Sequence, residues 1–527
     1  MTVRAVIALL LALCGPAAAL CPRGAAPAAT LYSADLRGLA IEEQLFFSSL
    51  QGITAQKQPR IYYLRDNGPS DSEWAEYYRE KGYIRELIPL EPWELAARFR
   101  GELKGAAVWD PGLTSTVNAA CAAAGAEALA VCTPELADRL NIPVKLDLRG
   151  RFSTDREVYE WMWKKYGGSF SRQALCSLEP MAAGAWLRDY TIQHRIFTFW
   201  VRSGSCGIPG GRPGDEDAMQ TIMARFPSNI PVLGFWQAGD ADEGLTEYGG
   251  LIFAGRTGKY TVVSDWTPNL SVHSGIRARG PFRQSPPRRL KYDPAKKYVM
   301  VTQYESGDCP WYWLRLQKAN WLQKERGSFP MNWCLGPRTA ELMPGVLEWF
   351  YANSAGSDCF FCAMSGAGYT MPRYFAPEDP GARRAFLRDT VRDMKRLDLS
   401  VISLHTDHWY SEPEPAEAYG EYAELKGVKA VLADFGRNET LPPERYAELC
   451  GSVPLFHTQN RWDMHETPET LTRDILGAKG QFISVMALSW TLDPAKIYKA
   501  LSALPPEYLI VRCDEMADLF LQRQGER

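Results

Sequence analysis

The feature that most constrains the fold is an alternation of short apolar runs with amphipathic segments, from about residue 291 to the end of the chain. The apolar runs are typical of buried strands, and the segments between them have helical periodicity. Two of the expected helices begin with a capping residue followed by proline, at Thr467-Pro468 and Asp493-Pro494. The expected strands are residues 298–303, 330–333, 359–364, 400–404, 429–432, 453–456, 482–486 and 509–511. This pattern predicts an α/β fold whose C-terminal domain, residues 291–527, is a barrel-like (β/α) domain of seven or eight units.

Two further regions are expected before the barrel. Residues 30–150 alternate short strands and helices, which predicts a small Rossmann-like α/β domain that lacks a nucleotide-binding loop. Residues 151–290 are less regular and predict a middle α+β region that ends in a basic, proline-containing connector at 277–289. In the first region the expected strands are 60–64, 106–109 and 128–131, and the expected helices are 73–81, 116–124 and 134–140. In the middle region helices are expected near 154–166, 183–201 and 215–225, before a strand at 230–235.

The first 19 residues have the pattern of a signal peptide. Arg4 supplies a positive charge, residues 5–13 are apolar, and Ala17-Ala18-Ala19 matches a cleavage site. We therefore expect a protein that is secreted or periplasmic after cleavage. A lipoprotein attached at Cys14 or Cys21 is the less favoured alternative, because leucine precedes each of these cysteines where a small residue is expected. No later segment has the 18 continuous apolar residues that a membrane span requires, so no stable membrane span is expected.

Composition excludes some functions and favours others. The formal net charge is -3 and there is no long basic run, so nucleic acid is not an expected partner. The chain has 17 Trp and 24 Tyr, more than a core usually requires, and flat rings suit the apolar faces of sugars, although most are expected inside. The cysteine spacings predict at most one or two disulfides. Cys359 and Cys362 are three residues apart in an expected strand, so their side chains should point to opposite faces and should not bind the same metal ion. No cofactor is expected.

The most informative local motif is the glycine-rich loop 365–372, Ser-Gly-Ala-Gly-Tyr-Thr-Met-Pro, between the strand expected at 359–364 and a helical segment. Such a loop at the carboxyl end of a strand brings main chain close to a ligand in α/β proteins. It resembles the signature of the GxGYxYP family of putative glycoside hydrolases, with Met371 in place of the second tyrosine. Other stretches that resemble the family are 107–111, 147–150, 232–236, 242–244 and 269–271.

The resemblance implies a carbohydrate substrate and the barrel-like fold. Barrels place their chemistry at the carboxyl ends of the strands, and hydrolysis of a glycosidic bond needs two carboxyl groups. Asp308 and Asp407, which follow two expected strands, are the predicted acid and base, with Asp434 and Asp463 as substitutes. The predicted substrate-binding residues at the same end of the barrel are Tyr369, Arg373, His405, His408, Trp409, Asp434, Arg461, Asp463 and Trp490.

Two alternatives stay open at this point. His405, Asp407 and His457 have the residue types of a divalent metal site, which would favour a metal-dependent polysaccharide deacetylase, although no metal is the main expectation. The stretch Ser306-Gly307-Asp308-Cys309 stands where the family usually has Asp-Gly-Asp-Asn, so one carboxylate and one amide are missing. That loss favours a glycan-binding protein without catalysis.

Overall fold

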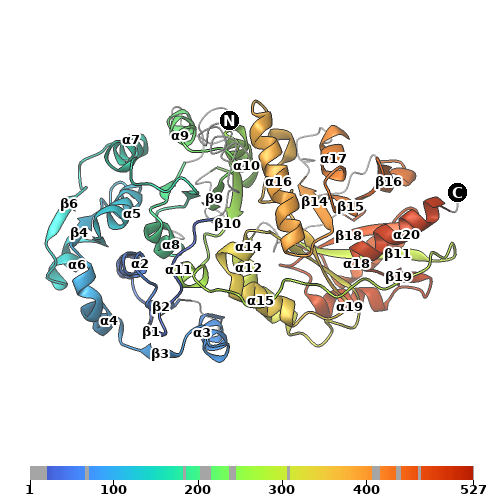
Figure 1. Cartoon of the computed structure of the whole chain (residues 1–527), viewed down its shortest axis with the longest axis horizontal. Coiled ribbons are helices and arrows are strands. Elements are labelled where there is room, and N and C mark those ends of the chain that lie inside the picture. Colours follow the sequence, from blue (N-terminus) through green and yellow to red (C-terminus); the bar gives the residue numbers. More distant parts are fainter. Residues whose placement is uncertain are drawn as a thin grey trace, which may run out of the picture.

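The computed structural model describes residues 21–65, 70–181, 185–201, 215–236, 245–304, 309–405, 416–434, 441–460 and 465–525. In Figure 1 the first helices and strands lie at one end of the molecule, the barrel-like domain lies at the other, and the strands β9 and β10 lie between them.

Two small parallel sheets form the N-terminal part. β1 (Thr30–Asp35), β2 (Ile61–Leu64) and β3 (Glu86–Pro89) form one sheet, and β4 (Gly105–Val108), β5 (Leu129–Cys132) and β6 (Val144–Asp147) form the other. Side chains of both sheets meet in one buried cluster, which includes Ile61 and Ala106. The strands predicted at 60–64, 106–109 and 128–131 are confirmed, whereas β1, β3 and β6 were not predicted. The helices are α2 (Ile41–Ala55), α3 (Ser70–Glu80), α4 (Pro92–Phe99), η1 (Arg100–Glu102), α5 (Thr116–Glu127) and α6 (Pro134–Arg139).

The middle part contains a four-stranded parallel sheet of order β10-β9-β7-β8. The helix predicted over 183–201 is wrong, since among the described residues 185–201 only 188–193 are helical and 197–199 form a strand. Arg195 has a positive φ of 51° that ends the helix, and the rings of Phe197 and Phe199 are fully buried in the sheet. The elements are α7 (Asp155–Tyr166), β7 (Leu175–Ser177), α8 (Arg188–Gln193), β8 (Phe197–Phe199), α9 (Asp215–Met223), β9 (Pro231–Gly234), α10 (Glu247–Arg256), β10 (Tyr260–Val263) and α11 (Leu270–His273).

The C-terminal part is a nearly closed barrel-like sheet. Its seven main strands are parallel and run in the order β17-β15-β14-β13-β12-β11-β18. Thr458, which directly follows β17, forms a β-bridge with Ser484 of β18. This bridge joins the first and last strands of the series. The strands are β11 (Lys297–Tyr304), β12 (Met331–Leu335), β13 (Asp358–Cys362), β14 (Val401–His405), β15 (Ala430–Asp434), β17 (Val453–His457) and β18 (Phe482–Leu488). Two extra strands are added: β16 (Ala447–Cys450) lies antiparallel to β17, and β19 (Tyr508–Ile510) pairs with the start of β11.

Each of the eight strands predicted for this domain is present within two residues. Most are separated by helices, and the caps at Thr467 and Asp493 are confirmed, since each side chain accepts a hydrogen bond from the main-chain N–H three residues later. The helices are α12 (Pro310–Arg315), α13 (Gln317–Trp321), α14 (Thr339–Leu342), α15 (Pro344–Ala352), η2 (Pro372–Tyr374), α16 (Pro380–Arg396), α17 (Ala416–Ala423), η3 (Pro443–Tyr446), α18 (Pro468–Gly477), α19 (Pro494–Ser502) and α20 (Cys513–Gly525).

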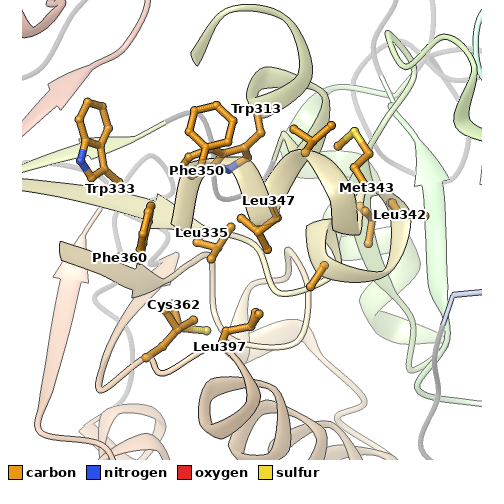
Figure 2. Close-up of a cluster of buried hydrophobic side chains, with 14 of the residues drawn as sticks. Trp313, Trp333, Leu335, Leu342, Met343, Leu347, Phe350, Phe360, Cys362 and Leu397 are labelled. Carbon is orange, nitrogen blue, oxygen red and sulfur yellow. The ribbon is translucent and has the colours of Figure 1, made fainter. Parts of the chain in front are cut away.

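Aromatic and aliphatic side chains pack together between the barrel and its helices (Figure 2). The ring of Trp313 meets that of Phe350 edge-on at 4.7 Å, and the rings of Trp321 and Phe360 are stacked at 5.8 Å. These four side chains are almost fully buried. The same cluster continues into the first region, where the indole N–H of Trp74 donates a hydrogen bond to the main-chain oxygen of Leu314 at 2.6 Å. The N-terminal part and the barrel therefore share a core.

The predicted connector has neither helix nor strand, and it runs along the barrel. Arg288 forms an ion pair of 2.7 Å with Glu515 of α20, and the side-chain amide of Gln284 donates to the main-chain oxygen of Phe360 at 3.0 Å. The connector is therefore held against the domain by specific contacts.

The cysteines of the described ranges are all free thiols, so the one or two disulfides that the spacings allowed are not found in this part of the chain. Cys359 and Cys362 belong to different buried clusters, which confirms that they face opposite sides of β13. Within the described ranges, no helix combines the length and hydropathy of a membrane span.

Candidate functional site

The signature loop after β13 needs glycine at two positions. Gly366 has a φ of +113°, and a Cβ atom there would overlap the side chain of Thr390. At Gly368 a Cβ atom would overlap the ring of Tyr260, which is fully buried in β10. The Thr390 hydroxyl also accepts a hydrogen bond from the main-chain N–H of Ala367 at 3.0 Å. The two glycines therefore let the loop lie against both α16 and the sheet of the middle region.

Tyr369 joins the loop to that sheet through its main chain. Its N–H donates to the oxygen of Thr261 at 2.9 Å, and the N–H of Thr261 donates back to the oxygen of Tyr369 at 2.8 Å. This antiparallel pair adds one loop residue to the edge of β10. The hydroxyl of Thr261 in turn accepts a hydrogen bond from the indole of Trp236 at 2.9 Å. The middle region thereby fixes the position of the loop at the carboxyl end of the barrel strands.

The side chain of Tyr369 lies at the centre of a buried polar group. Its hydroxyl donates a hydrogen bond to Glu247 Oε1 and lies 3.4 Å from His405 Nε2, with the two rings edge-on at 5.0 Å. The opposite contact to His405 comes from Tyr248, whose ring is stacked on the imidazole at 5.4 Å. Tyr369 and His405 are buried, and Glu247 is half-buried. Two predicted site residues thus meet two residues of α10 that the sequence did not point to.

Hydrogen bonds from neighbouring strands hold this group in place. The hydroxyl of Ser365 accepts from the main-chain N–H of His405 at 2.9 Å, and the main-chain N–H of Ser365 donates to the oxygen of Ser403 at 2.8 Å. The hydroxyl of Tyr304, the last residue of β11, lies 2.6 Å from Ser403 Oγ. The Tyr422 hydroxyl of α17 donates to the oxygen of Ser365 at 2.9 Å. The start of the signature loop is therefore anchored directly to β14 and α17, and β11 supports it through Ser403.

Two other predicted binding residues, Trp490 and Arg373, lie next to aromatic rings. Trp490 follows β18 and is 41% exposed, with its ring 5.6 Å from Trp311 and 5.3 Å from Tyr312. Arg373 lies in η2, directly after the signature loop, and its guanidinium is 5.7 Å from the ring of Tyr374. Their roles in binding stay predictions.

The remaining predicted residues are not placed by the structure. Asp308, Asp407, His408, Trp409, Arg461 and Asp463 lie outside the described residues. Asp434 is the last residue of β15, but its side chain is also outside them. The predicted acid and base therefore stay predictions that rest on sequence position, after β11 for Asp308 and after β14 for Asp407.

Histidine 457, a candidate ligand in the metal hypothesis, has a partner of its own. His457 Nε2 lies 3.7 Å from Glu448 Oε1 of β16. This contact and the neighbouring Arg445 lower the pKa of Glu448 to about 2. Among the described residues, no group of three His, Cys, Asp or Glu side chains is arranged to hold a metal ion. Asp407, which the metal hypothesis groups with His405 and His457, lies outside the described residues.

Comparison with known proteins covers nearly the whole chain. Residues 30–101 match the model of the GxGYxYP_N 1st domain, 103–170 that of the second domain, 172–275 that of the GxGYxYP third domain, and 295–520 that of the GxGYxYP putative glycoside hydrolase C-terminal domain. The signature loop and Tyr369 fall in the last of these matches, and Glu247 and Tyr248 fall in the third.

A solved structure has the same fold. A putative hydrolase from Bacteroides thetaiotaomicron VPI-5482 superposes with a TM-score of 0.80 at 17% sequence identity, over 97% of this chain and 98% of that one. At this identity the similarity concerns the fold. No curated protein matches the chain.

Proposed function

Since the chain belongs to the GxGYxYP family of putative glycoside hydrolases, we propose that it hydrolyses a glycosidic bond in an oligo- or polysaccharide at the carboxyl end of its barrel strands. The observation on which the proposal depends is the contact of the signature residue Tyr369 with Glu247 and His405. The group combines a phenol, a carboxylate and an imidazole, all of which form hydrogen bonds with hydroxyl groups.

The proposed reaction uses two carboxyl groups. One protonates the oxygen of the leaving sugar, and the other, as a carboxylate, activates water or attacks the sugar itself. Asp308 and Asp407 are the proposed acid and base, because both follow barrel strands at the end where Tyr369 and His405 lie. Tyr369 and Arg461 are proposed to orient sugar hydroxyls. In this scheme Glu247 positions Tyr369, since it accepts the hydrogen bond of the phenol.

Export belongs to the same proposal. The signal-peptide pattern in residues 1–19 supports a secreted or periplasmic enzyme, which would meet glycans outside the cytoplasm.

The test of the carboxylates uses the full chain with Asp308→Asn and Asp407→Asn. Each substitution should lower turnover of the best substrate from a panel of gluco-, manno-, xylo- and galacto-oligosaccharides by at least about 10³-fold, because a glycosidase loses its acid or its base. Affinity for the same sugar, measured by calorimetry, should stay within about threefold. Asp474→Asn on α18, whose carboxylate pairs with Arg473 at the surface, is the matched control. Unchanged turnover in both variants would remove these two residues from the mechanism.

A test of Tyr369 separates positioning from folding. Tyr369→Phe keeps the buried ring and removes the hydroxyl that meets Glu247 and His405. We expect kcat to fall by about 10- to 100-fold, the range for one hydrogen bond that acts in the transition state, while the thermal midpoint changes by a few degrees. A loss of kcat that is accompanied by loss of the folded state would contradict a role in catalysis.

A second candidate function is glycan binding without hydrolysis. It is favoured by the stretch Ser306-Gly307-Asp308-Cys309, which lacks one carboxylate and one amide of the usual family sequence. Binding of a panel sugar with no release of shorter products over a day would support this candidate over the hydrolase.

A further inference from the structure

Two tryptophans stand out because they are exposed. Nine large apolar side chains of the described ranges have substantial exposure, and the only tryptophans among them are Trp266, at 43%, and Trp490, at 41%. By contrast, the largest fully buried side chains include five tryptophans. An indole that remains in water gives up the free energy that its burial would provide, so such a site suggests a ligand.

The two exposed indoles belong to two pairs of rings that the guanidinium of Arg315 joins, a set we call the mouth aromatic series. The ring of Trp266 lies 5.5 Å from that of Trp186, and the guanidinium of Arg315 lies over both at 5.4 and 4.7 Å. The same guanidinium is 6.0 Å from the ring of Trp311, which lies 5.6 Å from Trp490. The series therefore consists of Trp186, Trp266, Arg315, Trp311 and Trp490.

The series links the middle region to the barrel at the end where the proposed site lies. Trp266 follows β10, the strand whose main chain pairs with Tyr369. Trp490 follows the carboxyl end of β18, and Trp311 lies in α12 after β11. Trp266 thus follows the strand that pairs with the signature loop, and Trp490 follows β18, which β11 and β12 separate from β13 in the same sheet.

The surroundings of Trp266 fix its ring before any ligand binds. Arg315 is held between indoles by cation–π contacts. The preceding residue, Asp265, is 7% exposed, and its burial raises the pKa of the carboxyl to about 7 in spite of the opposing charge of Arg315. Rings that are already supported lose little conformational freedom when a ligand stacks on them.

We propose that the mouth aromatic series is an extended carbohydrate subsite, in which Trp266 and Trp490 each stack against a separate pyranose ring of one oligosaccharide. This inference rests on the proposed function, because the same oligosaccharide reaches Tyr369 and His405. A pyranose carries rows of C–H groups on its faces and hydroxyls at its edge, which suit flat indoles beside a guanidinium. The contacts from Trp266 to Arg315, from Arg315 to Trp311 and from Trp311 to Trp490 measure 5.4, 6.0 and 5.6 Å, so the two exposed indoles are separate surfaces, and a ligand that stacks on both needs more than one sugar ring. The preferred substrate therefore has several sugar units.

The test compares ligand lengths in the full chain. Trp266→Ala and Trp490→Ala are titrated calorimetrically with gluco-, manno-, xylo- and galacto-oligosaccharides of two and six units. The six-unit ligand should bind about tenfold more weakly to each variant, equivalent to about 1.4 kcal/mol, whereas the two-unit ligand should lose less affinity in Trp266→Ala. Trp266→Phe, which keeps a smaller ring, should fall between the wild type and the alanine variant. Tyr498→Ala is the matched control, because Tyr498 on α19 is 43% exposed and lies outside the series.

The outcomes separate this inference from the proposed hydrolysis. If the tryptophan variants lose affinity for long ligands but the wild type cleaves none of them, the subsite stands and the hydrolase fails. If the wild type cleaves oligosaccharides and Trp266→Ala keeps the same preference for length, the subsite fails and the hydrolase stands. Absence of binding to every panel sugar, or equal affinities in the tryptophan variants and Tyr498→Ala, overturns the inference.

Discussion

Two groups of aromatic side chains in this molecule both contain tryptophans but differ in how far they are exposed to solvent. The interior aromatic cluster, made of Trp313, Trp321, Trp333, Phe350 and Phe360, has no member more than 1% exposed. The mouth aromatic series leaves Trp266 and Trp490 more than 40% exposed. The interior rings come from β12, β13 and the helices packed on them, whereas the two exposed rings follow strand ends. A high tryptophan content alone therefore does not indicate a ligand, and the exposure of the individual rings separates the two groups.

The largest effect should come from the interior. Trp321→Ala removes a ring that is stacked on Phe360 at 5.8 Å and meets Phe350 edge-on at 5.1 Å. We expect a loss of about 4 kcal/mol in the free energy of unfolding, because the cavity cannot close fully in a packed core. Denaturant titration followed by circular dichroism measures it. A loss below about 1 kcal/mol would show that the two aromatic groups do not differ in this way.

The next effect tests the contact between the signature loop and the interior. Gly368→Ala puts a methyl group into the ring of Tyr260, which packs against Phe386 at 5.5 Å. Overpacking of this kind should cost about 2 kcal/mol, and Gly420→Ala in α17, where nothing lies within 4 Å, should cost nothing. Both are measured by thermal unfolding. Equal midpoints for the two variants would contradict the role assigned to this glycine.

An effect of similar size depends on pH and on the buried carboxyl beside Trp266. The pKa of Asp265 is about 7 in the folded protein against an ordinary value of 3.8, so the folded state binds more protons between these values. Its ionisation opposes folding, and the wild type should lose stability as pH rises from about 4 to 7. Asp265→Asn should lack this loss and be more stable at pH 8 by about 2 kcal/mol, with about 4 kcal/mol as the upper limit for such a shift. Parallel stability profiles from pH 4 to 8 in both proteins would contradict this pKa.

The smallest effect on stability is expected at the exposed end of the series. Trp490→Ala removes a ring that contacts Trp311 and Tyr312 but remains 41% exposed, so the free energy of unfolding should change by less than about 1 kcal/mol. The same variant should lose affinity for long oligosaccharides. A change as large as that of Trp321→Ala would place Trp490 with the interior rings.

Much of the barrel could be predicted from local patterns, because each of its strands is a short apolar run followed by a turn or a capped helix. Residues 359–364 and 400–404, for example, correspond to β13 and β14. The predicted helix at 183–201 shows where such reasoning fails. Over a short stretch its apolar residues fit both the period of a helix and the period of a strand. Residues 197–199 form a strand because they pair with the neighbouring strand β7.

The candidate site was predictable only in part, because some of its contacts join segments that are far apart in the sequence. Tyr369 and His405 follow strands of one barrel, so topology brings them to the same end. Glu247 and Tyr248 belong to a helix more than 100 residues earlier. Contacts that are distant in sequence bring that helix to the barrel, among them the pairing of Thr261 with Tyr369 and the hydrogen bond from the N–H of Ala376 to the oxygen of Gly255 at 2.9 Å. The Thr246 side chain caps this helix in the structure, but a cap does not indicate the element against which a helix packs.

The pairing of Thr261 with Tyr369 also bears on how this protein could be divided. A gene fragment that encodes only residues 291–527 would separate the signature loop from the strand against which it is aligned. It would also discard Glu247 and Tyr248, which contact Tyr369 and His405. Shuffling between relatives would therefore have to exchange β10, α10 and the barrel together for the contacts of Tyr369 and His405 with α10 to survive.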